Sequence, residues 1–165
     1  MKSILLILLA LIISSLSSAQ TDDEKLDRKE PESVSANLEM IVPPETFVPS
    51  DAFNGYISIE NASAIIMTQI NNVNYKRVSE GMDEEFYELN QLNFISKESF
   101  VSDYKVNGVI YKLWFELKGD RYIRYMVYAG DLSKTLWLNI TYPEMLQEII
   151  EMEVLKSINT INLNP

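Results

Sequence analysis

The chain has 165 residues, a net charge of −10 near neutral pH, and neither histidine nor cysteine. It therefore lacks the usual general base near neutral pH, a thiol nucleophile, a Ser-His-Asp triad, disulfides and zinc ligation by His or Cys. Nucleic acid is disfavoured as a partner because an acidic chain repels a polyanion and the arginines are scattered along the sequence. We expect no cofactor and no metal site.

The N-terminus has the pattern of a secretory signal peptide. Lys2 is followed by an apolar run at residues 4–13 and then by small residues ending at Ala19. This predicts a signal peptide over residues 1–19, with cleavage between Ala19 and Gln20. An uncleaved anchor is the alternative, but the run is short for a membrane span. Without cysteine there is no thioether lipid anchor, so we expect an exported protein, periplasmic or secreted, with no stable membrane anchor after cleavage.

Residues 20–36 are acidic, contain no aromatic side chain and have few apolar ones. Such a segment buries too little surface to offset chain entropy, which predicts a disordered acidic linker. It would be a spacer, a docking tail or a solvated leader. The remaining residues, 37–165, are enough for a single domain.

The first half of this domain alternates strands and a helix. A short strand is expected at residues 38–42, ended by Pro43-Pro44, and strands at 53–59 and 64–70 should form a hairpin. Residues 71–80 are polar. A helix should start at Asp83 as the N-cap, with Met82 and Tyr87 in a hydrophobic staple. Its predicted buried stripe comprises Phe86, Leu89 and either Leu92 or Asn93.

The second half is centred on a three-stranded antiparallel meander at residues 111–142. A strand at 94–102 leads to it through a tight turn predicted at Asn107-Gly108. A two-residue turn at Gly119-Asp120 would set Lys118 opposite Arg121.

In this register, and with Ala129 opposite Thr135, the first face of the meander carries Tyr111, Leu113, Phe115, Leu117, Tyr122, Arg124, Met126, Tyr128, Leu136, Leu138 and Ile140. The second face carries Lys112, Trp114, Glu116, Ile123, Tyr125, Val127 and Trp137. Large apolar groups on both faces predict that helices or loops cover part of each. A closing helix should run from Pro143 to about residue 158. Its predicted stripe comprises Leu146, Ile149, Ile150, Met152 or Glu153, and Leu155.

This order of elements resembles the PsbP-like fold. The resemblance rests on Pro43-Pro44-Glu45-x-Phe47, Phe53-x-Gly55-Tyr56, Asn107-Gly108 and Thr141-Tyr142-Pro143-Glu144, and covers most of the chain from Asn37. It implies an α+β fold class with an α/β/α sandwich around a central antiparallel sheet, and non-catalytic, partner-binding roles. The group includes the PsbP subunit of photosystem II and a nuclear-import factor that binds the GTPase Ran. An exported chain meets neither partner, so no functional residue is transferred.

Two features are candidates for binding. Trp114, Tyr125 and Trp137 would form an aromatic group on the second face, either as core or as the lining of a cleft for an apolar ligand or peptide. Arg124 would be costly if buried alone, so it should pair with an acid such as Glu98 or Glu39, face water, or bind a ligand anion.

We therefore expect a non-catalytic exported protein, not an enzyme, that binds a macromolecular partner or a small apolar ligand through its sheet face or edge. A protein partner in the envelope or outside the cell fits this expectation best. The alternative is a carboxylate-based hydrolase using Glu116 with Asp103 or Asp131. Acids at turns and strand ends more often keep a protein soluble, and those at the predicted helix start more often stabilise its dipole than bind calcium.

Overall fold

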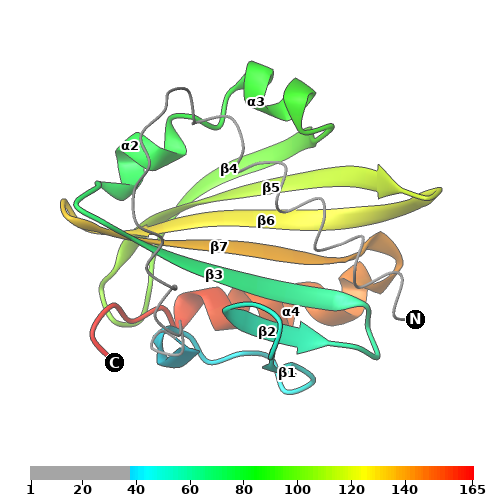
Figure 1. Ribbon diagram of the computed structural model, residues 1–165, viewed down its shortest axis with the longest axis horizontal. Coiled ribbons are helices and arrows are strands. Elements are labelled where there is room, and N and C mark those ends of the chain that lie inside the picture. The colour runs from blue at the N-terminus through cyan, green and yellow to red at the C-terminus, as the bar shows by residue number, and fades with distance from the viewer. Residues whose placement is uncertain (1–37) are drawn as a thin grey trace, which may run out of the picture. The chain divides into compact units, whose positions relative to one another are not determined.

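The computed structural model describes residues 38–165, all of which belong to one compact unit. The predicted signal peptide, its cleavage site and the predicted linker lie outside the described residues. The described chain forms a seven-stranded antiparallel sheet in the order β1-β2-β3-β7-β6-β5-β4, in which strands next to each other in this order are hydrogen-bonded (Figure 1). Strands hold more of the described residues than helices do, and the three helices α2, α3 and α4 accompany the sheet, which confirms the α+β class.

The elements, in chain order, are η2 Leu38–Met40, β1 Val48–Pro49, β2 Gly55–Ser58, β3 Ser63–Asn71, α2 Tyr75–Ser79, α3 Glu84–Leu89, β4 Asn93–Val101, β5 Asn107–Leu117, β6 Asp120–Gly130, β7 Lys134–Pro143, η3 Glu144–Leu146 and α4 Gln147–Asn159. The β2–β3 hairpin, the central place of β3 and the strand β4 agree with the sequence-based predictions. Asp83 caps α3 as predicted, since its Oδ1 accepts a hydrogen bond from Phe86 N at 2.9 Å.

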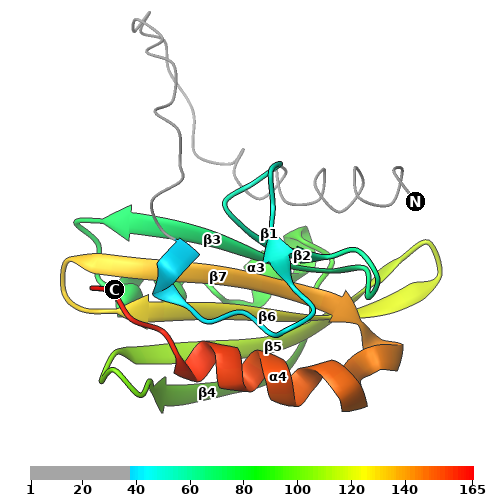
Figure 2. The same cartoon turned by 90° about the horizontal axis from the view of Figure 1, so that it is seen from below.

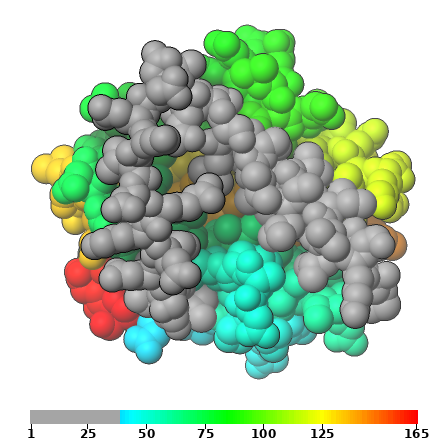
Figure 3. Space-filling view, viewed as in Figure 1, coloured from blue at the N-terminus to red at the C-terminus, as the bar shows by residue number. Residues whose placement is uncertain are grey.

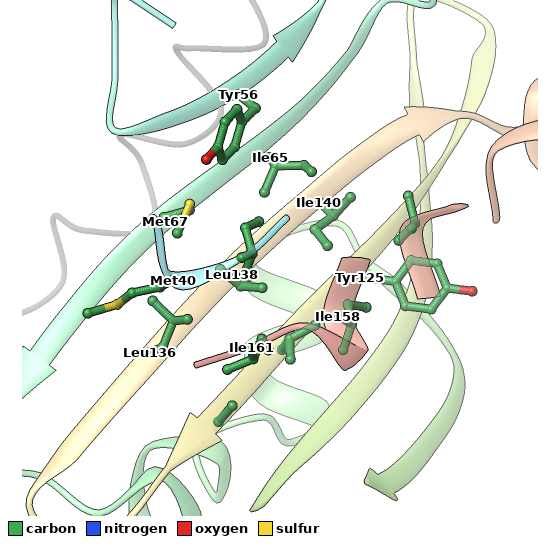
Figure 4. Packing of buried hydrophobic residues seen from close by; sticks show 14 of the residues in the cluster. Met40, Tyr56, Ile65, Met67, Tyr125, Leu136, Leu138, Ile140, Ile158 and Ile161 are labelled. Carbon is green, nitrogen blue, oxygen red and sulfur yellow. The ribbon is translucent and has the colours of Figure 1, made fainter. Parts of the chain in front are cut away.

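One face of the sheet, called here the α4 face, is covered by the C-terminal helix (Figure 2). Val127, Leu138 and Ile140 are fully buried there in one cluster with Val154 and Ile158 of α4. Figure 4 shows Leu138, Ile140 and Ile158 within this cluster. The predicted helix stripe was partly wrong. Ile149 and Met152 are 71% and 65% exposed, because the stripe that meets the sheet is Ile150, Val154 and Ile158.

The opposite face, called the α2–α3 face, carries the two shorter helices beside β4 to β7. Tyrosine hydroxyl groups attach this pair to the sheet: Tyr111 donates to Ser79 O at 2.7 Å and Tyr128 to Met82 Sδ at 3.2 Å. Tyr87 of α3 donates to Met82 O at 2.9 Å. The sequence did not predict α2, whose N-cap is Asn74. Within α3, the predicted core residue Leu89 is instead 75% exposed.

The meander has a different register from the predicted one. Leu117 pairs with Asp120, so the turn is Lys118-Gly119, with φ angles of 56° and 89°. This shift of two residues keeps the predicted faces of β5 and β6. In β7, Gly130 rather than Ala129 pairs with Thr135, a change of one residue that moves every β7 side chain to the other face. Leu136, Leu138 and Ile140 therefore lie on the α4 face, and Trp137 stacks on Tyr128 on the α2–α3 face.

The turn predicted at Asn107-Gly108 is not a turn. Both residues lie inside β5, where Gly108 pairs with Phe100 on one side and Ala129 on the other. The Phe100 ring occupies the space beside Gly108, since an added Cβ would stand 2.3 Å from Phe100 Cε1. Glycine is therefore needed for close packing. The actual turn spans Ser102 to Val106.

The strand predicted at residues 38–42 is also absent. Leu38–Met40 forms a 3₁₀ turn, and Met40 and Ile41 are buried in the core beneath the α4 face. The backbone of this segment bonds the C-terminal end of the chain, with Asn162 N donating to Met40 O and Val42 N to Thr160 Oγ1. These contacts replace a strand partner in the sheet.

Candidate functional site

Arg124 is a buried cation on the α2–α3 face. It lies in the middle of β6, directly opposite Leu113 of β5 and Thr141 of β7, and is only 8% exposed. Its guanidinium carbon stands 4.4 Å from the centre of the Phe115 ring, a cation–π contact. Its Nε donates a hydrogen bond to Thr141 Oγ1 at 3.2 Å.

No acid among residues 38–165 forms an ion pair with Arg124. The partners predicted for it, Glu98 and Glu39, are both exposed elsewhere, on the edge strand β4 and on η2. Nor does Arg124 face open water. Burial lowers the pKa of the guanidinium from 12.5 to about 10, so it remains protonated at neutral pH.

Arg124 stands at one end of a row of side chains on the same face. Thr141 Oγ1 is 3.4 Å from Asn139 Oδ1. Trp137 is the next residue of the row and lies two positions before Asn139 in β7. The adjoining strand β3 adds Ile66 beside Asn139 and Thr68 beside Trp137. At about 3.3 Å per residue, the row from Thr141 to Trp137 is about 13 Å long.

The described helices cover only part of this face. α2 and α3 pack on β4, β5, β6 and the nearer end of β7, and no described helix packs on β3 there. In the space-filling view α3 lies at one border and the segment around β1 and β2 at the opposite border (Figure 3). Ile66 and Trp137 are half-buried, and the Trp137 Nε1 group is a buried donor without a hydrogen-bond partner. Such an unpaired donor is unusual and fits a position where a ligand supplies the acceptor.

The aromatic group predicted from Trp114, Tyr125 and Trp137 does not form. Trp137 lies on the opposite face from the other two, and Trp114 pairs with Ile123 rather than with Tyr125. The ring of Trp114 is covered by Arg121, whose guanidinium carbon is 3.8 Å from the ring centre. Tyr125 is buried beneath α4. The proposed cleft on that face is therefore absent among the described residues.

A polar network joins α4 to the sheet on the α4 face. The Glu151 carboxylate accepts hydrogen bonds from Lys112 Nζ and Tyr125 OH, and from Gln147 Nε2 at 2.9 Å. Burial raises the pKa of Glu151, but these hydrogen bonds outweigh it and lower the pKa below the ordinary value of 4.5. The pKa of Tyr125 is raised, by burial first and then by its bond to Glu151. A carboxylate held ionised by three donors serves as an anchor and is poorly suited to act as a general base.

The carboxylate pair considered for hydrolysis is not assembled. Glu116 lies near the β5–β6 turn, opposite Arg121, whereas Asp103 and Asp131 lie in turns at the other end of β5. The length of β5 separates the two positions by about 30 Å. In the described part of the chain, no group of three or more Asp, Glu, His or Cys side chains could hold a metal ion.

A cleft of about 500 Å³ opens at that same end of the sheet. It is formed by the start of α2, the turn between β4 and β5, the turn between β6 and β7, and the C-terminal residues. Sequence reasoning missed this cleft, because its walls come from four segments that are distant in sequence. It also missed Thr141 and Asn139 as neighbours of Arg124, because the predicted register placed them on the wrong face.

Comparisons with known proteins leave the function open. The chain matches no model of a known protein family and no curated protein. Among solved structures, it is similar to a Pseudomonas aeruginosa protein of unknown function, with 9% sequence identity and a TM-score of 0.44 over 62% of this chain and 74% of the other. This similarity is too low to transfer a function. Within residues 38–165, no helix is both long and apolar enough to span a membrane.

Proposed function

We propose that the protein is a non-catalytic binding protein whose α2–α3 face takes an apolar ligand carrying an anionic group such as a carboxylate. The observation that carries this proposal is Arg124, a buried cation with no ion pair among the described residues. Burying a lone charge is costly, and proteins keep such a charge where a ligand or partner neutralises it. The planar guanidinium suits a carboxylate because it can donate two parallel hydrogen bonds.

The row beside Arg124 supplies the other half of the proposed site. Trp137 and Ile66 offer half-buried apolar surface within the length of an extended alkyl chain whose head group is at Arg124. Trp137 Nε1 offers one more unpaired donor. Ligand sites commonly combine apolar walls with a few polar groups that fix orientation. A fatty-acid-like molecule, with its carboxylate at Arg124 and its chain along β7, satisfies both requirements.

The remaining sequence-based predictions belong to the same proposal. Helices on both faces of the sheet would make the domain an α/β/α sandwich, as the resemblance to the PsbP-like fold implies. Two of the motifs behind that resemblance, the strand at residues 38–42 and the turn at Asn107-Gly108, form other structures. Export to the periplasm or the medium, and a protein partner there, rest on the sequence alone. The hydrolase alternative has lost the acid pair that suggested it.

The test is binding of dodecanoate against dodecanol, which has the same chain length without the charge. The chain has two tryptophans, so in the Trp114→Phe variant Trp137 alone reports binding through its fluorescence. We expect dodecanoate to change the Trp137 emission with saturation and to bind at least about tenfold more tightly than dodecanol, the difference of one charge-assisted contact. Arg124→Met in the same background should remove that preference.

Arg121→Met is the matched control, because Arg121 is an exposed arginine of the same strand on the α4 face. It should leave the preference for dodecanoate unchanged. Equal affinity for the acid and the alcohol, or an equal loss in both arginine variants, would contradict the proposed role of Arg124. Saturable binding without any change in Trp137 emission would place the ligand elsewhere and contradict the proposed face.

A further inference from the structure

A concave site lies away from Arg124, at the end of the sheet where α2 begins. Its cleft of about 500 Å³ is within the usual range for small-ligand sites. The site does not depend on the proposed function of the α2–α3 face, because its walls are turns and chain ends rather than sheet residues around Arg124.

The cleft is positive in an otherwise acidic chain. Lys76 of α2 and Lys105 of the β4–β5 turn both line it, and Asp131 is the acid among its lining residues. The Asp131 Oδ1 atom is occupied by backbone donors, Ser133 N at 2.7 Å and Lys134 N at 2.8 Å. Because the chain as a whole carries a net charge of −10, this balance favours an anionic ligand at this position.

The turn that carries Lys105 is held in an uncommon conformation. Lys105 has a φ of 64°, a region that glycine and asparagine adopt more readily than lysine. Ser102 fixes this turn, since its N–H donates to Val106 O at 2.9 Å and its Oγ accepts from Val106 N at 3.1 Å. The neighbouring Tyr104 is 60% exposed at the cleft. This hydrogen-bonded turn thus contributes both a cation and an aromatic ring to the lining of the cleft.

Amide side chains provide the rest of the polar lining. Asn74 uses its Oδ1 to cap α2 through Lys76 N at 2.9 Å, and Asn162 uses its Oδ1 to accept from Asn164 N at 3.0 Å. The Oδ1 bonds leave the Nδ2 group of each amide available as a donor. Donors of this kind suit hydroxyl oxygens, whereas the lysines suit a carboxylate.

We propose that this cleft binds an acidic saccharide, a sugar that carries a carboxylate. The lysine ammonium groups would hold the carboxylate, the amide groups the hydroxyls, and the Tyr104 ring the apolar side of the sugar ring. Neither charge alone nor aromatic surface alone requires a sugar. The combination of two cations, several amides and an exposed tyrosine in one cleft is what points to a polyhydroxylated anion.

The test uses amide chemical shifts of the purified protein in titrations with glucuronate, glucose and inorganic phosphate. Glucuronate should shift the amides of Lys105, Asn107 and Asp131 with saturation, and should bind more tightly than either of the others. The double variant Lys76→Gln, Lys105→Gly should weaken glucuronate binding by about tenfold. Glycine accepts the positive φ of residue 105, so this variant keeps the turn.

The matched control is Arg77→Gln, which removes a cation from the same short helix but does not line the cleft. It should leave the affinity for glucuronate unchanged. Glucose binding as tightly as glucuronate would overturn the role of the lysines, and phosphate binding as tightly would overturn the saccharide class. No saturable shift at the cleft would overturn the site itself. Because Arg124 is intact in every variant, these outcomes do not depend on the site on the α2–α3 face.

Discussion

At the scale of single residues, Arg124 is the position where stability and the proposed function oppose each other. The sequence identified Arg124 as unusual, because a cation flanked by apolar neighbours in a predicted strand needs a partner. It could not identify the neighbours themselves, since these depend on the register of β7. The observed register places Thr141 opposite Arg124. The predicted acid partners, Glu98 and Glu39, lie elsewhere.

Replacing Arg124 by methionine should stabilise the unliganded protein. The pKa of Arg124 is about 10 in the folded state, below its ordinary value of 12.5. A basic group with a lowered pKa destabilises the fold at every pH at which it is charged in both the folded and the unfolded state. This penalty is complete below that pKa and disappears as the pH rises through the ordinary value of 12.5. At neutral pH we expect Arg124→Met to raise the free energy of unfolding by about 1–4 kcal/mol in urea denaturation. Arg121→Met removes an exposed ring contact and an exposed ion pair and should lower it by no more than about 1 kcal/mol. A clear loss of stability in Arg124→Met would identify Arg124 as structural.

At the scale of secondary-structure elements, the sequence patterns predicted which segments form strands or helices. They predicted less well on which face of an element each side chain lies. The β6–β7 connection shows why. Asp131 accepts hydrogen bonds from Ser133 N and Lys134 N within a turn closed by Gly130 and Thr135, one residue shorter than the predicted loop. Side chains alternate along a strand, so this one residue decides the face of Trp137. Hydrophobic content could not settle it, because large apolar side chains lie on both faces of the meander.

In helix α4 the sequence likewise does not decide which of the neighbouring residues Ile149 and Ile150 faces the core. Ile150 is 5% exposed in the core of the α4 face, whereas Ile149 is 71% exposed. We expect Ile150→Ala to lower the free energy of unfolding by about 2–5 kcal/mol, the usual result of emptying a core site. Ile149→Ala should change it by less than about 0.5 kcal/mol, since the side chain loses little contact. Urea denaturation of both variants measures the difference, and equal losses would mean that α4 is rotated from the described position.

At the scale of the whole molecule, the two faces of the sheet are stabilised in different ways. The α4 face has a large apolar core that includes Met40, Ile41 and the C-terminal residues, with Glu151 as a polar contact between helix and sheet. The α2–α3 face has a smaller core with tyrosine hydroxyl bonds, and no described helix packs on its β3 part. The sequence predicted apolar groups on both faces. It could not predict that one face would be completed by residues near 40 and near 160, because that depends on contacts between residues over a hundred positions apart.

The acid stability of the molecule should depend on Glu151. Its pKa is lowered in the folded state by Lys112, Tyr125 and Gln147, against the opposing effect of burial. A carboxylate with a lowered pKa stabilises the fold above its ordinary value of 4.5, and this contribution is lost as the pH falls through the lower folded value. Glu151→Gln should therefore reduce stability by about 1–3 kcal/mol near neutral pH, where it leaves Lys112 without its anion. The difference from the unmodified protein should shrink steadily below about pH 4.5.

Thermal unfolding followed across that range measures the difference, with Glu148→Gln as the control on the exposed side of the same helix. Because every other carboxylate titrates equally in the three proteins, only the difference between their curves reports Glu151. The control curve should follow that of the unmodified protein throughout. If the Glu151→Gln curve instead stayed parallel to it down to about pH 3, the carboxylate would have no preferential bond in the folded state, and α4 would be held to the sheet by apolar packing alone.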